Sequence, residues 1–381
     1  MVKEKDLYKI RAEISPGFNY YFDKFTSLFV KSKTHPIKNP KKILFIRNDH
    51  IGDMVYSTQI FREIKKIFPN TKISVLATRS NREIIEKDPY VDEILEIDLF
   101  WRRGLRGFLD YFKILKKIKK EKFDVGVDLR RSKLNIIFFL WIPKIKARAS
   151  FYNLNGGKAF LTHPILYDKK ANYAQENIRL INKVFGLDIK NYLPHVIADK
   201  EDEKEVEKLL KKNDLKKYVV FAPGATANSK RWPEEKFKEL IERFHDKYPN
   251  HKIILSGAGS DTNLIRRLGD DRDFCVPLIN FNLRLMSVIF KKAGAVVAND
   301  GCATDICWVA GGNLVALVGP VDLELCKPLK KSKIIHHKVD CYPCFWAREC
   351  EKPKKEWCMN LITTDEVIKA IHEFMGENKL S

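Results

Sequence analysis

The sequence predicts an α/β protein made of two doubly wound domains, each with a parallel sheet. The chain has 381 residues, which is long for a single core. Short apolar runs alternate with segments of helical spacing, the pattern of a parallel sheet covered by helices. The alternation lapses in the polar residues 151–200 and then restarts. We therefore expect an N-terminal domain over residues 1–190 and a C-terminal domain over residues 191–381, both Rossmann-like.

The N-terminal half contains four apolar runs that are expected to be buried strands. They are Ile43–Ile46, Ile73–Ala77, Ile94–Ile97 and Val125–Leu129. Helices are expected from the residues after the first strand to Phe68, and over Arg82–Lys87, Phe108–Lys120 and Gln175–Phe185. Residues 1–40 are a basic, aromatic-rich lead-in. This lead-in either packs on the protein or lies as a short amphipathic helix on a membrane surface.

The C-terminal half repeats the alternation after a charged helix over Asp202–Lys212, whose N-terminal end suits Asp. Strands are expected over Tyr218–Ala222, Lys252–Ser256, Ala295–Ala298 and Leu314–Leu317. Helices are expected over Glu234–Lys247, Asn263–Leu268, Leu283–Lys292 and Ala303–Val309. Two such halves predict a cleft between domains, with ligands bound beyond the carboxyl ends of the strands.

The charge balance limits the classes of partner. The chain has 70 Lys and Arg against 49 Asp and Glu, a formal net charge of +21. This excess favours an anionic partner, such as a nucleic acid, an acidic lipid surface or a phosphorylated substrate. The basic residues are dispersed and no nucleic-acid recognition motif is present, so we expect no nucleic-acid partner. Without a signal-peptide core or an apolar run of 18 residues, the expected location is the cytoplasm.

Gly52 and Asp53 follow the first predicted strand, where that strand turns into a helix. Gly52 permits close approach of a ligand to the backbone, and Asp53 places a carboxylate at the carboxyl edge of the sheet. Asp53 is expected either to take a proton as a general base or to cap the helix. Asp49, four residues earlier, is a candidate for the same two roles.

The stretch Tyr218–Pro233 predicts a phosphate site. A buried strand ends at Pro223-Gly224, a loop of small and hydroxyl-bearing residues follows, and Lys230 precedes the next helix. Loop amides can face an anion and a lysine adds a point charge. Gly224, Thr226, Ser229 and Lys230 are the candidate ligands of a diphosphate. The other interpretation is an ordinary strand-to-helix turn with solvated cations.

Two further loops in this half are candidates for anion or sugar binding. Asp300 and Gly301 follow a buried strand and precede a helix, whose N-terminal amides favour an anion. Asp261 follows the glycine loop Ser256–Ser260 and is expected either to bind ribose hydroxyls or to sit in a tight turn.

Four of the eight cysteines cluster near the end of the chain as Cys341, Cys344, Cys350 and Cys358. Such a cluster suits zinc, an iron–sulfur centre or disulfides. A cytoplasmic location argues against stable disulfides. We therefore expect a structural role, with a structural metal as one form of it.

Several stretches of the chain, in this order, resemble glycosyltransferase family 9, the ADP-heptose:lipopolysaccharide heptosyltransferases. They are ILFIRNDHIGDMVYSTQIFREIKKIFP, DPYVDE, FDVGVDLRRS, APGATANSKRWPEEKF, SGAGSD, VVANDG and ALVGPVD, and the late cysteine pattern ending Cys358-Met359 is similar too. The resemblance runs from about Lys42 to Ile368, most of the chain.

This resemblance implies a GT-B fold, in which two Rossmann-like domains face a cleft. The N-terminal domain would bind the acceptor, with Gly52 and Arg130 as contacts, and the C-terminal domain would bind the nucleotide sugar. Asp53 matches the family's proposed catalytic base, and Lys230 the lysine that contacts the donor diphosphate. Thr226 matches a nearby hydroxyl. The family transfers sugar with inversion and needs no metal.

Further correspondences concern the nucleotide. Asp261 lies where the family commonly has a glutamate that reaches the nucleoside, and Asp300 matches the first residue of the family's Asp-Thr-Gly-Pro-Met-His motif. This chain reads Asp-Gly-Cys-Ala-Thr-Asp there, so Gly301 and Asp305 replace a threonine and the histidine.

The expected function is transfer of a sugar from a nucleotide diphosphate sugar to an acidic glycolipid of the lipopolysaccharide core type. Heptose is the first expectation for the sugar, and ADP-heptose for the donor. The altered loop leaves a different donor sugar, or a non-catalytic binder of sugar nucleotides, as alternatives, and another GT-B enzyme such as an epimerase as a third. The basic Phe108–Lys120 helix and Arg130-Arg131 are expected to meet the acidic acceptor or the inner membrane face, unless they form a merely solvated face.

Overall fold

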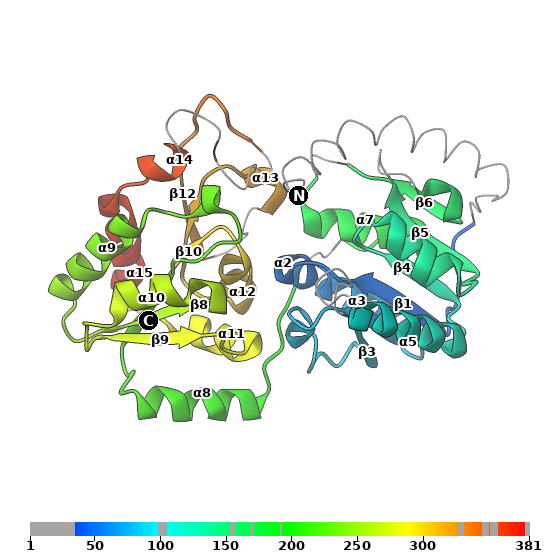
Figure 1. Cartoon of the computed structure of the whole chain (residues 1–381), viewed down its shortest axis with the longest axis horizontal. Coiled ribbons are helices and arrows are strands. Elements are labelled where there is room, and N and C mark those ends of the chain that lie inside the picture. Colours follow the sequence, from blue (N-terminus) through cyan, green and yellow to red (C-terminus); the bar gives the residue numbers. More distant parts are fainter. Residues whose placement is uncertain are drawn as a thin grey trace. The chain divides into compact units, whose positions relative to one another are not determined.

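The computed structural model describes residues 35–97, 105–152, 157–168, 171–190, 193–326, 331–344, 350 and 357–377. The chain divides into two compact units, Met1–Pro194 and His195–Ser381. The predicted boundary near residue 190 lies close to this division. Each unit has its own six-stranded parallel sheet (Figure 1). The basic, aromatic lead-in of the sequence lies almost wholly outside the described residues.

The N-terminal sheet has the strand order β3-β2-β1-β4-β5-β6. Its strands are β1 (Lys42–Arg47), β2 (Lys72–Ala77), β3 (Glu93–Glu96), β4 (Val125–Asp128), β5 (Ala147–Tyr152) and β6 (His163–Leu166). All neighbours pair in parallel, with Ile43 opposite both Ile73 and Val125. The chain therefore starts in the middle of the sheet and builds outward first on one side and then on the other.

Helices cover both faces of this sheet. They are α2 (Ile51–Val55), α3 (Thr58–Ile67), α5 (Leu105–Glu121), α6 (Lys133–Asn135) and α7 (Tyr173–Phe185), with the short turns η1 (Arg82–Ile84), η2 (Ile136–Trp141) and η3 (Lys158–Phe160). Phe45 packs edge-on against Phe61 of α3. The adjacent residues Leu44 and Ile46 belong to the core cluster that contains Ile118 of α5. Because neighbouring strand residues point to opposite faces, α3 and α5 cover opposite faces.

The C-terminal sheet repeats the same topology in the order β12-β11-β10-β7-β8-β9. Its strands are β7 (Tyr218–Ala222), β8 (Lys252–Gly257), β9 (Cys275–Ile279), β10 (Val296–Asn299), β11 (Leu314–Val318) and β12 (Ser332–His336). All pairs are parallel. The first strand in the chain, β7, again lies in the middle, beside β10.

Helices also cover both faces of the second sheet. They are α8 (Lys200–Lys212), α9 (Glu234–Lys247), α10 (Thr262–Gly269), α11 (Leu283–Lys292), α12 (Cys302–Ala310), α13 (Leu323–Cys326), α14 (Trp357–Leu361) and α15 (Thr364–Glu377), with the turns η4 (Asn228–Lys230) and η5 (Gly259–Asp261). Val219 and Phe221 pack with α9, α10 and α15 in one large core cluster. Tyr218 points the other way and donates its hydroxyl to Ile289 O of α11.

Apart from β5, the interior strands agree with the sequence expectation, as does the edge strand β3, whereas β6, β9 and β12 were missed. These three are edge strands, and β6 and β9 contain Pro164 and Pro277, a residue that sheets tolerate at edges. β5, α6, η2, η3 and α13–α15 were also missed. The helix expected to run to Phe68 is interrupted after Val55, where Ser57 Oγ donates to Asp53 O. The expected helix over Arg82–Lys87 is only the turn η1.

Helix α8 begins two residues earlier than expected, and the aspartate that caps it is Asp199. The Asp199 side chain accepts from Glu201 N and Asp202 N, and Asp202 closes a capping box. Asp202 therefore lies inside the first turn. Among the residues that the structure describes, no helix is long and apolar enough to cross a membrane.

Candidate functional site

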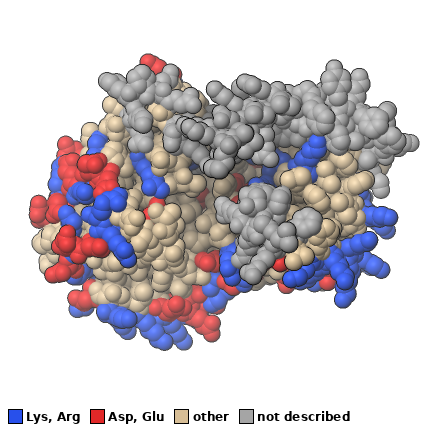
Figure 2. Space-filling view, in the orientation of Figure 1, with Lys and Arg blue, Asp and Glu red and all other residues tan. Residues whose placement is uncertain are grey.

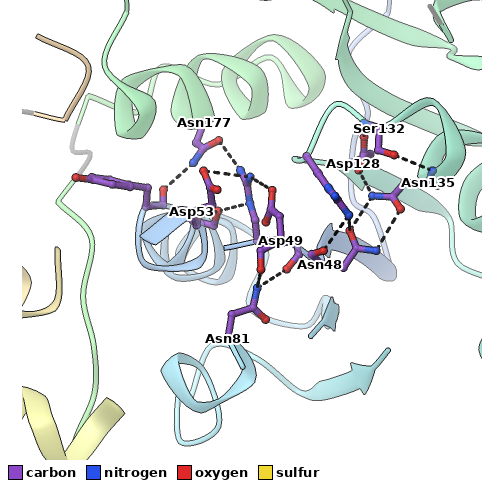
Figure 3. Close-up of polar contacts among 12 residues, drawn as sticks. Asn48, Asp49, Asp53, Asn81, Asp128, Ser132, Asn135 and Asn177 are labelled. Carbon is purple, nitrogen blue, oxygen red and sulfur yellow. Dashed lines mark hydrogen bonds and ion pairs between the residues drawn. The ribbon is translucent and has the colours of Figure 1, made fainter. Parts of the chain in front are cut away.

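The polar residues of the N-terminal unit gather where the strand order of its sheet reverses. Strands β1 and β4 lie side by side, and the connections that follow them lead to opposite sides of the sheet. The loop after β1 carries Asn48 and Asp49 (Figure 3), and the loop after β4 carries Arg130. This position, beyond the carboxyl ends of the strands, is where open α/β sheets bind ligands.

Arg47 is the last residue of β1, and its buried guanidinium is the centre of this cluster. Its Nε donates to Ser57 Oγ at 2.9 Å, and its Nη2 donates to Asn177 Oδ1 at 3.3 Å. Its Nη1 donates to Asp49 Oδ2 at 3.2 Å and lies 3.8 Å from Asp53 Oδ1. One guanidinium nitrogen therefore faces both carboxylates (Figure 3).

The two carboxylates have different surroundings. The Asp53 side chain is 33% exposed, whereas that of Asp49 is 10% exposed. Burial raises the pKa of Asp49 to about 7, with the charge of Arg47 opposing the rise and that of Asp53 adding to it. The N-cap of α2 is His50, which makes no side-chain capping bond. Neither aspartate is thus the N-cap, and the Asp53 carboxylate is the more exposed of the two.

A second set of contacts braces the loop after β4. Asn135 Nδ2 donates to Asn48 Oδ1 at 2.9 Å and to Asp128 Oδ1 at 3.0 Å. Asp128 also accepts from Ser132 N at 2.8 Å. Burial raises the pKa of Asp128, and these hydrogen bonds oppose the rise. Arg130 Nη1 donates to Asn48 O at 3.1 Å, so the predicted acceptor contact is anchored to the β1 loop.

In the C-terminal unit, the reversal of strand order lies between β7 and β10. The turn η4, which follows β7, ends at Lys230, and Asp300 follows β10. Lys230 Nζ lies 2.6 Å from Asp300 Oδ2, and the side chains are 29% and 13% exposed. The structure therefore joins two residues that the sequence singled out separately.

Arg231 and Asp261 form a second ion pair beside the first. Arg231 Nη2 donates to Asp261 Oδ1 at 3.1 Å and to Ala225 O at 2.9 Å. Asp261 Oδ2 accepts from Ala258 N at 3.1 Å. A Cβ on Gly224 would lie 2.4 Å from Asp261 Oδ2, so only glycine fits there without a shift. Asp261 is buried and braces the two loops, in keeping with the tight-turn interpretation.

The remaining predicted donor contacts differ in exposure. Thr226 is exposed, whereas Ser229 is buried. Gly301 is the N-cap of α12 in an extended conformation, with φ of 168°, and a Cβ there would have no atom nearer than Asn299 O at 3.9 Å. Thr226 is thus open to a ligand. The local backbone does not require a glycine at position 301.

Sequence reasoning missed Arg47, Asn177, Arg231 and Asn299 as site residues. Asn299 Oδ1 accepts from Trp232 N at 3.1 Å and Nδ2 donates to Pro223 O at 2.8 Å, which joins the β7 and β10 loops. Arg47 and Asn299 each end a strand of buried apolar residues, and a polar residue in that position is a signal that could have found them. Asn177 enters from α7 and has no such local signal.

The late cysteines are near enough to affect one another. Burial raises the pKa of Cys358 to about 11 and also raises that of Cys344, with the charges of Cys341 and Cys350 adding to both shifts. The described residues contain no group of three or more His, Cys, Asp or Glu side chains arranged to hold a metal ion. The predicted structural metal therefore finds no support there. Cys358 is buried and lines the space above Gly319, which is a packing role.

The N-terminal unit has a partly exposed carboxylate, Asp53, and the C-terminal unit has a lysine, Lys230, at the switch point of its own sheet. A carboxylate can accept a proton from a hydroxyl, and a lysine can offset the charge of a departing phosphate.

Comparisons with known proteins agree with this chemistry. A model of glycosyltransferase family 9 (heptosyltransferase) matches residues 111–355. The chain is 25% identical over 319 residues to lipooligosaccharide heptosyltransferase 2 of Haemophilus influenzae, covering 78% of this chain and 89% of that protein. It is 22% identical to lipopolysaccharide heptosyltransferase 2 of Escherichia coli over 326 residues, 78% of this chain and 90% of that protein.

The fold is also shared. The solved structure of Escherichia coli ADP-heptose lps heptosyltransferase II superimposes with a TM-score of 0.74 at 19% identity, over 89% of this chain and 99% of that one. The two parallel sheets are thus those of a GT-B protein. Since the family model covers more than half of the sequence, the chain belongs to glycosyltransferase family 9 and is a glycosyltransferase.

Proposed function

We propose that this enzyme transfers heptose, with inversion, from ADP-heptose to a sugar hydroxyl of a lipopolysaccharide-core or related glycolipid acceptor. The observation that carries the proposal is the Lys230–Asp300 pair at the switch point of the C-terminal sheet. A lysine held there by one carboxylate supplies the cation that a diphosphate needs, and the exposed Thr226 adds a hydroxyl. The names of the relatives supply the sugar and the acceptor class.

The proposed reaction is a single displacement. The acceptor hydroxyl attacks the anomeric carbon from the face opposite the diphosphate, forming the new C–O bond as the bond to the diphosphate oxygen breaks. The hydroxyl proton passes to the Asp53 carboxylate, and ADP leaves with its charge offset by Lys230. Since Lys230 provides this positive charge, the proposed step uses no metal ion or other cofactor.

Two measurements test this function. Thermal shift with a panel of nucleotide sugars should give its largest increase with ADP-heptose, because a ligand that binds the folded state raises apparent stability. Asp53→Asn should retain that shift but lose transfer to a lipopolysaccharide acceptor that lacks heptose. If another donor raises the unfolding temperature and ADP-heptose does not, the assignment of heptose is wrong. Transfer that persists in Asp53→Asn would remove the proposed base.

A different donor sugar is the second candidate, because of the altered loop after β10. Asp305 lies in the first turn of α12, where an added carboxylate opposes an anion at the helix N-terminus. The same donor panel separates the two candidates.

We also propose that the N-terminal unit meets the acidic acceptor at a membrane surface. Leu109 and Phe112 of α5 are exposed, as are Phe138 and Trp141 of η2, and Tyr111 packs against Phe138 so that the two elements are neighbours. Lysines follow along the exposed side of α5, and Figure 2 has Lys and Arg gathered at that edge of the unit. Exposed apolar side chains beside cations suit an anionic bilayer surface.

A further inference from the structure

The Arg47 guanidinium is held by two partners other than the carboxylates. Ser57 accepts from its Nε and Asn177 accepts from its Nη2. The third nitrogen, Nη1, faces the two carboxylates. It lies 3.2 Å from Asp49 Oδ2 and 3.8 Å from Asp53 Oδ1. The two aspartates therefore share one cation whose position is fixed by other partners (Figure 3).

Asp49 is an unusual partner for this cation, because half of its carboxyl group has no partner. Its Oδ1 is buried without a hydrogen bond from any residue that the structure describes. A buried, unpaired carboxylate oxygen is costly when charged and much less so when the group is protonated. The geometry thus favours a proton on Asp49 in the resting protein, in agreement with its raised pKa of about 7.

We propose that Asp49 is a positioning residue for sugar transfer, which sets the basicity of Asp53 by competing with it for Arg47. This inference rests on the proposed role of Asp53 as the base. While Asp49 carries a proton, the charge of Arg47 acts on Asp53 alone and makes it a weaker proton acceptor. Once Asp49 ionises, it takes a share of Arg47 and adds a second negative charge, so Asp53 accepts a proton more readily.

Among the residues that the structure describes, three charged groups act on Asp49, and the titratable His50 follows it in the chain. Arg47 comes from β1, Asp53 from α2 and Arg130 from the loop after β4, and these are the charged groups that act on its titration. The neighbouring contacts from the β2 loop and α7 are amides: Asn81 donates to Asp49 O, and Asn177 accepts from Arg47. A change in rate near neutral pH is therefore assigned to this pair by replacing Asp49 itself.

The first test is the pH dependence of transfer, with ADP-heptose and a lipopolysaccharide acceptor that lacks heptose. The wild-type kcat should rise about 3–10-fold as pH passes through about 7, the size expected for a modest gain in base strength. Asp49→Asn, which keeps an oxygen for Arg47, should remove this step and hold kcat at the low-pH level. The KM for donor should not change, since the donor contacts lie in the other unit.

Asp88→Asn is the matched control, because it makes the same change at a buried carboxyl that receives Tyr90 N at 3.0 Å. Its pH profile should superimpose on that of the wild type. Thermal unfolding of each variant at pH 6 checks that it is folded. Should Asp49→Asn fail to fold, Asp49→Ser replaces it in the same assay.

The second test needs no substrate. Infrared difference spectra of the wild type should contain a protonated-carboxyl band that disappears between about pH 6 and pH 8 and that is missing in Asp49→Asn. In Asp53→Asn the same band should disappear at lower pH, because the Asp53 charge adds to the raised pKa of Asp49. This shift measures the coupling of the two acids directly.

Three outcomes would overturn the inference: a rate profile of Asp49→Asn that matches the wild type, a loss of kcat by one factor at every pH, or an infrared midpoint that Asp53→Asn leaves unmoved. The failure of the proposed function is a separate result, since then Asp53→Asn itself would transfer sugar. An inactive Asp53→Asn with a wild-type profile in Asp49→Asn would remove only the role of Asp49.

Discussion

Lys230 Nζ lies 2.6 Å from Asp300 Oδ2, so the lysine predicted to bind the diphosphate is already paired with a carboxylate. The pair spans the loops after β7 and β10, 70 residues apart in the chain. Because Lys230 is 29% exposed, we expect a bound diphosphate to contact its ammonium group, either in place of Asp300 or together with it.

Replacing Lys230 with alanine should lower kcat/KM by about 10²–10³-fold, the loss typical of removing one group that stabilises developing charge. Lys230→Arg should recover part of this, because the charge remains but the shape differs. The measurements are initial rates of ADP release and calorimetric titration with ADP. Lys238→Ala, a surface lysine paired with Glu234, is the control. Unchanged ADP affinity and rate in Lys230→Ala would exclude the assigned role.

Gly224→Ala should destabilise the C-terminal unit by about 1–3 kcal/mol, the usual cost of overpacking a tight site. Its Cβ would lie 2.4 Å from Asp261 Oδ2, and Asp261 is held by Arg231 and Ala258 N. Urea unfolding measures the change. Gly301→Ala is the matched comparison for stability, because its Cβ would have no neighbour within 3.9 Å. Equal stability of the two variants would contradict the assigned contact.

Glu93→Gln should weaken the attachment of α5 to the sheet. Burial alone would raise the pKa of Glu93, but hydrogen bonds from Lys117, Lys72 and Ser74 lower it to about 2. Since the folded pKa lies below the ordinary 4.5, this stabilisation is present above pH 4.5 and is lost as pH falls through about 2.

We expect Glu93→Gln to lose about 1 kcal/mol at neutral pH, a value discounted for solvent screening, and the difference from wild type to vanish near pH 2. Urea unfolding across this range measures it. Glu86→Gln, at a surface pair with Arg82, should lose less than about 0.5 kcal/mol. A loss for Glu93→Gln that is independent of pH would show that the charge is not the cause.

The double variant Phe112→Ser, Trp141→Ser should bind anionic vesicles at least about 10-fold more weakly. The reason is that two exposed apolar side chains are removed from the proposed membrane-binding surface. Co-sedimentation with vesicles of anionic or zwitterionic lipid measures this, and the wild type should prefer the anionic ones. Leu361→Ser changes an exposed apolar residue of the other unit and should have no effect. Wild-type binding by the double variant would reject the proposed surface.

The sequence by itself determined the interior strands of both sheets, apart from β5, and which polar residues follow them. The runs Ile43–Ile46 and Tyr218–Ala222 are apolar on both faces, as strands buried between two helical layers must be. Asp53, Lys230 and Asp300 follow such strands closely, and a parallel sheet brings its carboxyl ends to one edge. These conclusions need only local periodicity and the topology that it implies.

Only the tertiary structure decided β5 and the edge strands β6, β9 and β12, the partner of each charge and which loop residues are exposed. Nothing near Arg47 in the sequence indicates Asn177, which lies 130 residues away, or that Asp49 is nearly buried while Asp53 is partly exposed. Ser229 is buried and Thr226 exposed within one loop. The burial and pairing of a polar group depend on packing between distant segments, whereas a pattern in the sequence reports only on neighbours a few residues apart.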